Sequence, residues 1–265
     1  MLGTALCQAL SSHELITPAR YELNIGNFEQ VKKFKDFDFI VHLAAETDHE
    51  LCDLNPSQCY FANTIGTAHM TRLAIEHRKP ILYLSAGSIF DGEKLTSYNT
   101  EDIPNPINHY NSSKWYGELL CRAYRKHYIL RAGWMFGGGP QIDKKFVNKI
   151  MKKIKSGQTE IMVCDDCIGS PTYSVDLAET IKFIIEDEIE YGTYHFVNEG
   201  EGASRYAFAQ EIVKALDSKV KIAQCRIDDL KDEFPCKRTN YEVLKTSFGS
   251  RHWKEALKEY ILAKY

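Results

Sequence analysis

A tyrosine and a lysine four positions apart, Tyr110 and Lys114, are the residues of this chain best suited to chemistry. On a helix these two positions share one face and lie one turn apart. There the lysine ammonium can lower the pKa of the phenol from its usual value near ~10. Such a tyrosine can exchange a proton with a carbonyl or alcohol oxygen near neutral pH, as nicotinamide-dependent carbonyl chemistry requires. Alone, the spacing is far more typical of two side chains on a solvated helix face.

Composition narrows the class of protein. The chain has 265 residues, 44% of them hydrophobic and 26% charged, which suits one large α/β domain or a domain with a smaller lobe. A net charge of −3 with both signs interspersed predicts neither a nucleic-acid nor a membrane-surface partner. The apolar runs are too short to span a bilayer, and we expect no signal peptide.

The eight cysteines lack the spacing of a disulfide framework. Reduced thiols in the cytoplasm are therefore the prediction. Cys164 and Cys167 have the spacing of half a zinc site, but no second Cys/His pair matches them. We predict that the chain binds no metal.

Near-continuous apolar runs at 37–44, 80–85 and 128–134 alternate with helical patterns at 57–77 and 110–126. This alternation predicts a Rossmann-type, doubly wound parallel sheet covered on both faces. Such sheets bind ligands beyond the carboxyl ends of their strands. We expect the segments that follow these strands to line one crevice with Tyr110.

The pattern changes towards both ends of the chain. A strand at 15–17 and a helix at 27–34 are expected before the first long run. After residue 140 the rhythm loosens, which predicts a dinucleotide-binding domain over 1–140 and a smaller, partly interwoven substrate-binding lobe over 141–265. In this lobe we expect helices at 145–156, 176–186 and 206–216, and short strands at 159–163 and 194–197.

The first ten residues read as a helix with no strand before it. Dinucleotide-binding domains normally begin with a strand and a glycine-rich turn whose amides meet the pyrophosphate. Gly3 is the one glycine of such a turn that is present. We expect that the first strand and most of the turn are missing because the sequence is truncated or mis-started. The alternative is a domain that truly lacks this strand and binds its cofactor more weakly.

Six motifs follow one another in a recognisable order. They are HLAAET at 42–47, NTIGT at 63–67, IFDG at 89–92, YNSSK at 110–114, WMFG at 134–137 and DCIGSPTY at 166–173. On these motifs the chain resembles the extended short-chain dehydrogenase/reductases over nearly its whole length. Within them it is most similar to the RmlD-like family of dTDP-4-dehydrorhamnose reductases.

The resemblance implies hydride transfer from a reduced nicotinamide to the C4 ketone of a dTDP-linked 4-keto-6-deoxy sugar. Tyr110 would protonate the developing alkoxide, and Lys114 would hold the nicotinamide ribose. Asn63 is expected to be structural support, and Arg131 a structural ion-pair partner. The implied cofactor contacts are Leu2, Gly3, Arg20, Asn24, Ala44, Ala45, Thr47, Tyr110 and Lys114. The implied substrate contacts are Trp134, Gly169, Ser170 and Arg238, although a core Trp134 and a solvated turn at Arg238 are close alternatives.

Charge at the expected second strand bears on the cofactor. NAD-preferring domains place an acid there to bind the ribose 2′-hydroxyl. This chain has TPAR at 17–20, and a guanidinium such as that of Arg20 suits a 2′-phosphate. NADPH is therefore the predicted cofactor, with NADH possible and Arg20 as a plain surface residue the alternative.

Ala86 departs from the resemblance, because the family has a serine or threonine hydroxyl there that binds the substrate carbonyl. Ser85 and Ser88 are the neighbouring hydroxyls. If the segment stays extended, the side chains of Ala86 and Ser88 share a face while Ser85 points to the other. Ser88 is thus the predicted third catalytic residue.

The prediction from sequence is an NADPH-dependent reductase of a nucleotide-linked sugar. A nucleotide-sugar epimerase or dehydratase on the same scaffold is one alternative, although Gly87 stands where dehydratases usually have acids. A catalytically silent binding subunit is another, favoured by Ala86 and the incomplete glycine turn. A homodimer is possible.

Overall fold

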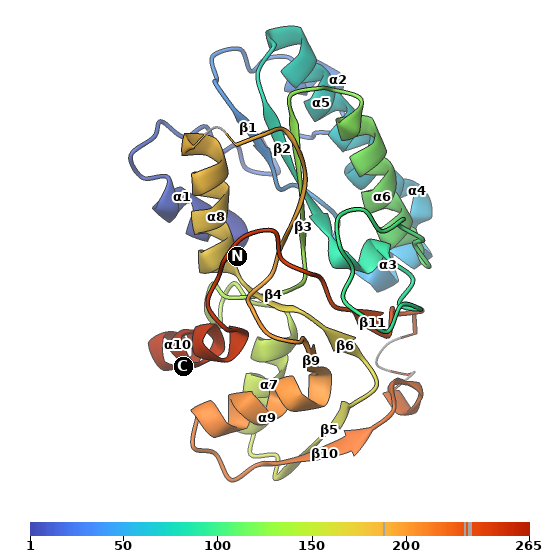
Figure 1. Cartoon of the computed structure of the whole chain (residues 1–265), viewed down its shortest axis with the longest axis vertical. Coiled ribbons are helices and arrows are strands. Elements are labelled where there is room, and N and C mark those ends of the chain that lie inside the picture. Colours follow the sequence, from blue (N-terminus) through green and yellow to red (C-terminus); the bar gives the residue numbers. More distant parts are fainter. Residues whose placement is uncertain (188, 231, 233–234) are drawn as a thin grey trace.

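The computed structural model describes residues 1–187, 189–230, 232 and 235–265. Its main sheet has four parallel strands in the order β1-β2-β3-β8 (Figure 1). These are β1 (Ile40–His42), β2 (Ile81–Ala86), β3 (His127–Ala132) and β8 (Gly192–Phe196). The central strands β2 and β3 are mostly buried, because helices cover both faces of the sheet. The predicted doubly wound parallel fold is confirmed.

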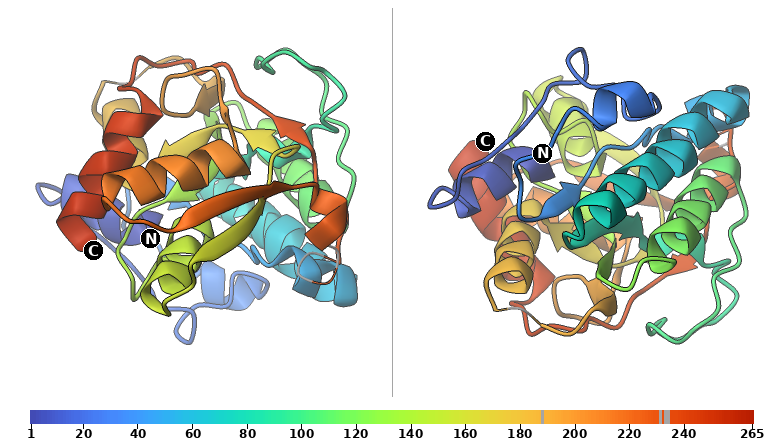
Figure 2. Two further views of the ribbon diagram at one scale, coloured as in Figure 1. Left: turned by 90° about the horizontal axis from the view of Figure 1, so that it is seen from below. Right: turned by 90° about the horizontal axis from the view of Figure 1, so that it is seen from above.

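Helices α1 (Leu2–Ala9) and α8 (Ser174–Glu186) cover one face of the sheet (Figure 2). Leucines of α1 pack there against Leu82, Leu130 and the apolar side of α8. Because α8 leads directly into β8, residues beyond 170 complete the first sheet. The division of the chain at residue 140 stays a prediction.

The opposite face is covered by α2 (Phe28–Val31), α5 (Gly66–His77) and α6 (His109–Arg122). Tyr83 and Ile129 point to this side and are fully buried there. Alternate residues of a strand face opposite sides, so β2 presents Tyr83 and Ser85 towards α6.

The remaining elements form a second core, seen below the main sheet in Figure 1. It is built around aromatic side chains, of which Phe136, Phe208 and Tyr260 are almost wholly buried. Its helices are α7 (Phe146–Lys155), α9 (Arg205–Ala215) and α10 (Trp253–Lys264). Two of its small sheets are strand pairs, β4 (Trp134–Phe136) with β7 (Pro171–Tyr173) and β5 (Glu160–Cys164) with β10 (Lys221–Cys225). In a third sheet, β6 (Ile168–Gly169) lies between β9 (Ala203–Ser204) and β11 (Tyr241–Glu242).

The expected strand at 15–17 is wrong. Leu15 and Ile16 lie in an exposed loop, and Pro18 follows them without a backbone N–H. A strand needs a neighbour for its backbone hydrogen bonds, and within the described residues β1 pairs with β2 alone. No strand precedes β1 in the described part of the chain.

The expected helix at 57–77 is three segments. They are α4 (Pro56–Tyr60), a π-helical turn (Phe61–Ile65) and α5. A shorter helix, α3 (His49–Leu54), precedes them. Sequence periodicity also missed β10 and α10. None of the helices in the described part of the chain has the length and apolar character that a membrane span needs.

Arg131 of β3 and Glu118 of α6 form a buried ion pair that ties the helix to the sheet. Arg131 donates to both carboxylate oxygens of Glu118, at 3.0 Å from Nε to Oε1 and 2.8 Å from Nη2 to Oε2. Both side chains are buried. The predicted structural role of Arg131 is confirmed.

Candidate active site

The first turn of α6 carries Tyr110. The Asn108 side chain caps this helix by accepting a hydrogen bond from the Asn111 amide at 2.8 Å. Tyr110 is buried against Cys52 and Cys59, with 9% of its surface exposed. The His49 ring lies over it, with 4.2 Å between ring centroids.

Lys114, one turn later on α6, faces the carboxyl end of β2. Its Nζ donates to the Leu84 carbonyl oxygen at 2.7 Å and lies 4.2 Å from the centre of the Tyr83 ring. Burial lowers the Lys114 pKa to about 7. The lysine is thus held on the strand by a backbone carbonyl and an aromatic face.

The expectation that Lys114 lowers the Tyr110 pKa is wrong for this structure. Burial raises the pKa of Tyr110, and the Glu242 carboxylate raises it further, while Arg238 opposes them. The phenol therefore keeps its proton at neutral pH. A protonated phenol suits donation to an oxygen and not abstraction from one.

Asn63 connects α6 to the loop that follows β1. Its Oδ1 accepts from the Glu46 amide at 2.7 Å, and its Nδ2 donates to the Glu46 carbonyl at 3.0 Å and to Ser113 Oγ at 2.9 Å. It sits in the π-helical turn, a feature that often occurs at functional sites. The expected structural role of Asn63 agrees with these bonds.

The segment after β2 does not stay extended. A 3₁₀ turn over Gly87–Ile89 begins directly after Ala86 and places Ser88 within it, half-buried. The face-sharing argument for Ser88 therefore fails. Ser85 is buried on the α6 side of β2, and its hydroxyl finds no hydrogen-bond partner among the described residues. Both serines remain candidates for the hydroxyl that Ala86 lacks.

Five of the expected cofactor contacts form two groups, one at the start of α1 and one in the loop after β1. Leu2 is buried, and a Cβ added to Gly3 would meet no atom within 4 Å. Ala44, Ala45 and Thr47 lie in the loop after β1 that Asn63 anchors. These residues follow the start of α1 and the carboxyl end of β1, the two places where such folds approach a dinucleotide.

Arg20 and Asn24 stand apart from these groups, in the loop between α1 and α2. Arg20 is an exposed turn residue, and without a strand at 15–17 the charge argument for NADPH loses its premise. Asn24 stabilises its own loop, because its Oδ1 accepts from the Gly26 amide at 3.0 Å.

The expected substrate contacts meet around Trp134. Its Nε1 donates to the Glu242 carboxylate, and the Arg205 guanidinium lies 3.4 Å from its ring centre. Gly169 packs so closely that an added Cβ would lie 2.3 Å from the indole. A larger residue at Gly169 would displace the tryptophan.

Ser170 and Arg238 have partners of their own. Ser170 is buried, and its Oγ accepts from the Leu244 amide at 3.0 Å, which indicates a structural role. Arg238 forms an ion pair with Glu50 of α3.

Three cations lie close to Tyr110, of which sequence reasoning named Arg238 and missed Lys145 and Arg205. Burial and the charges of Arg238, Lys145 and Arg205 lower the His49 pKa to about 2. Burial, and after it the charge of Arg238, also lowers the pKa values of Lys145 and Arg205, as expected for cations that lie near one another. Such a cluster offers charge-assisted hydrogen bonds to an anion, a phosphate group in particular. Only the folded structure brings these residues together, because they lie far apart in sequence.

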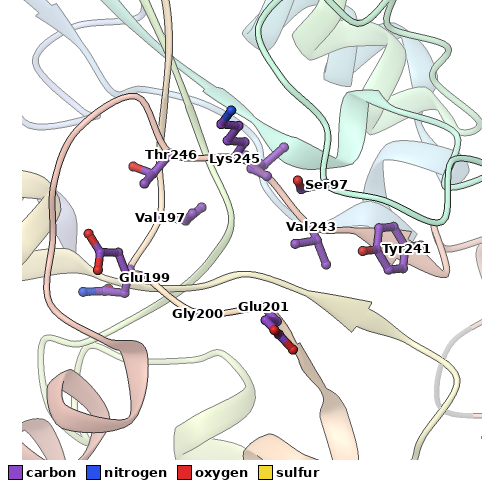
Figure 3. A pocket seen from close by; sticks show the side chains of 11 residues that line it. Ser97, Val197, Glu199, Gly200, Glu201, Tyr241, Val243, Lys245 and Thr246 are labelled. Carbon is purple, nitrogen blue, oxygen red and sulfur yellow. The ribbon is translucent and has the colours of Figure 1, made fainter.

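A cavity of about 410 Å³ lies beside this region, between the segments around Glu199 and Tyr241 (Figure 3). Lys245, Glu199 and Glu201 are its charged lining residues. Tyr110 is not among the described side chains that line it.

Comparison with known proteins bears on this geometry. The model of the RmlD substrate binding domain family matches residues 1–265. The chain belongs to this family. It is 30% identical to the spore coat polysaccharide biosynthesis protein SpsK of Bacillus subtilis, over 98% of this chain and 93% of that protein.

Two solved structures are closely similar. A dTDP-4-dehydrorhamnose reductase from Clostridium acetobutylicum is 32% identical, with a TM-score of 0.91 over 99% of this chain and 95% of that one. The enzyme of that name from Bacillus anthracis, in complex with NADP, is 26% identical, with a TM-score of 0.91 over the same shares of the two chains. The predicted resemblance is confirmed.

We expect Asn63→Ala to lower the free energy of unfolding by about 1–3 kcal/mol, because it leaves the part-buried backbone groups of Glu46 without this partner. Urea unfolding measures this. The control is Asn105→Ala, an exposed asparagine that bonds Asp91, which we expect to change stability by less than about 0.5 kcal/mol. Equal losses in the two variants would contradict the assigned role of Asn63.

We expect stability to rise with pH above neutrality because of Lys114. Its pKa is about 7 in the folded chain and near 10.5 when unfolded, so between these values only the unfolded chain binds the proton. The free energy of unfolding should therefore gain up to about 1.4 kcal/mol per pH unit over that range. Lys114→Met should show a flatter profile in urea unfolding, and Lys258→Met, an exposed control, the wild-type one. Parallel profiles for all three proteins would refute this.

Proposed function

We propose that this chain is an NADPH-dependent reductase that converts the C4 ketone of a dTDP-linked 4-keto-6-deoxy sugar to an alcohol. The single observation that carries the proposal is a protonated, buried Tyr110 within a fold whose close relatives are dTDP-4-dehydrorhamnose reductases. The proposed partner is a small nucleotide sugar. A homodimer and a cytoplasmic location stay predictions.

The residues present fit a nicotinamide dinucleotide. Open space at Gly3, at the start of an eight-residue helix, leaves the first amides of α1 accessible to phosphate. Ala44 and Ala45, with small side chains, permit close approach to the loop after β1. When bound, NADPH supplies the hydride.

The protein supplies the proton. Tyr110 Oη holds it, because burial and Glu242 disfavour the phenolate, and donates it to the oxygen of the reduced carbonyl. Lys114, anchored on the Leu84 carbonyl, is placed to orient the ribose beside it. The transfer leaves a buried phenolate, which a charged Lys114 one turn along α6 would stabilise.

The cation cluster suits the other end of the substrate. Arg205, Arg238 and Lys145 together bring three positive charges to a region shared with His49. A nucleoside diphosphate carries negative charge, which complements these three cations. Trp134, bonded to Glu242 and covered by Arg205 and Gly169, holds Arg205 in place beside this region.

Tyr110→Phe should lower kcat by about 10²–10⁴, since it removes the proton donor and little volume. NADPH oxidation with the dTDP-linked ketosugar measures this, and NADPH fluorescence should show unchanged cofactor affinity. Tyr60→Phe is the matched control, because Tyr60 also contacts α6, through His109 at 3.3 Å, and should keep full activity. A wild-type chain that binds NADPH neither alone nor with the sugar would favour the silent binding subunit instead.

Ser88→Ala should lower kcat at least tenfold if its hydroxyl replaces the one absent at Ala86, since one preorganised donor is typically worth about 10²–10³. Ser85→Ala is the comparison, because its buried hydroxyl is the competing candidate. An unchanged rate for Ser88→Ala together with a loss for Ser85→Ala would move the role to Ser85.

A further inference from the structure

Three cysteines of the second core lie together. Cys164 ends β5, Cys167 precedes β6, and Cys225 ends β10 in register with Cys164. All three are buried in one cluster, with Ile227 and Leu230 packed against it. The proposed reduction uses none of these thiols.

Cys164 and Cys167 are close neighbours within this cluster. Their sulfur atoms lie within 4.8 Å of each other, on either side of a loop whose Asp165 is exposed. Each keeps 5% of its surface exposed. A hydrogen bond from the Cys167 thiol, aided by Arg205, lowers the Cys164 pKa, whereas the Cys167 pKa is raised. A nucleophilic cysteine three positions from a second thiol, with two residues between them, is the arrangement of redox-active dithiols.

The same loop offers a carboxylate, which makes a metal site the rival. Asp166 lies within 4.8 Å of both sulfurs. Its two oxygens are already engaged, because Oδ1 accepts from the Ile227 amide at 2.8 Å and Oδ2 pairs with Arg226 at 3.1 Å. A structural zinc ion needs four committed ligands. The contacts of Asp166 therefore favour thiol chemistry.

We propose that Cys164 and Cys167 form a reversible disulfide by exchange with small-molecule disulfides such as oxidised glutathione. The Cys164 thiolate attacks one sulfur of the small disulfide and releases one thiolate. Cys167 then attacks Cys164 Sγ, the mixed disulfide breaks, and a second thiolate leaves. The protein loses two electrons, the small disulfide gains them, and the two thiol protons end on the released thiolates.

The disulfide has a route to the site around Trp134. The Cys167 carbonyl accepts from the Arg205 amide at 3.0 Å, and the Arg205 guanidinium stacks on Trp134. Closing the bond draws the sulfurs to about 2.05 Å, so the loop must shift where Arg205 begins α9. This consequence rests on the proposed function, whereas the exchange itself does not.

The test is equilibration of the full chain in glutathione buffers of graded redox ratio, followed by alkylation and mass spectrometry. We expect the peptide with both cysteines to lose two hydrogen atoms at oxidising ratios and to regain them on reduction. Cys164→Ser and Cys167→Ser should abolish the change, and Cys225→Ser should retain it. The pair Cys52 and Cys59 is the internal control, since both are almost wholly buried and should stay reduced.

Kinetics test the consequence separately. The oxidised chain should show at least a threefold higher KM for the nucleotide sugar, with kcat changed less, and Cys167→Ser should be insensitive to the buffer. An inactive chain would count against the proposed reductase and leave the redox titration to decide the exchange.

Three outcomes would overturn the proposal. Cys164 and Cys167 could both stay alkylatable in every buffer. Cys164 could pair with Cys225 instead. Added Co²⁺ could produce a thiolate charge-transfer band that Cys164→Ser removes and that blocks oxidation, which would assign a metal site to the loop.

Discussion

The side-chain amide of Asn63 is the interaction on which the candidate site depends. It pairs with both backbone groups of Glu46 and with the Ser113 hydroxyl, so the loop after β1 and helix α6 are fixed to one point. The π-helical turn that carries Asn63 provides this position. Without the Asn63 side-chain amide, the hydrogen bonds that join the loop after β1 to α6 would be lost. Tyr110 would then be oriented by packing alone.

Burial then decides the protonation states. In water a neighbouring ammonium would make a phenol more acidic, but inside this protein desolvation is the larger effect for Tyr110 and Lys114 alike. The phenol is kept neutral and the amine loses much of its basicity. In the proposed reduction the neutral phenol donates its proton, and a charged Lys114 would stabilise the anion left behind.

Sequence patterns predicted the features that depend on the residues of one segment. Long apolar runs became β2 and β3, and a charged Arg131 within such a run implied the buried partner that Glu118 provides. The prediction of a strand at 15–17 was wrong because a strand must pair with a neighbouring strand. The β propensity of a segment does not show whether such a neighbour is present. The convergence of Arg205 on Trp134 was not predicted for the same kind of reason, since it joins residues from separate strands and helices across the second core. The pKa of Tyr110 depended on burial, which spacing on one helix does not reveal.

Isotope transfer tests the central claim most directly. NADPH deuterated at C4 of the nicotinamide is incubated with this chain and a dTDP-linked 4-keto-6-deoxy sugar, and the sugar is analysed by mass spectrometry and NMR. Our account predicts a product one deuterium heavier, with the label at C4 of the sugar and the new hydroxyl proton drawn from solvent. Unlabelled or unreduced sugar, with the chain folded and the cofactor bound, would contradict it.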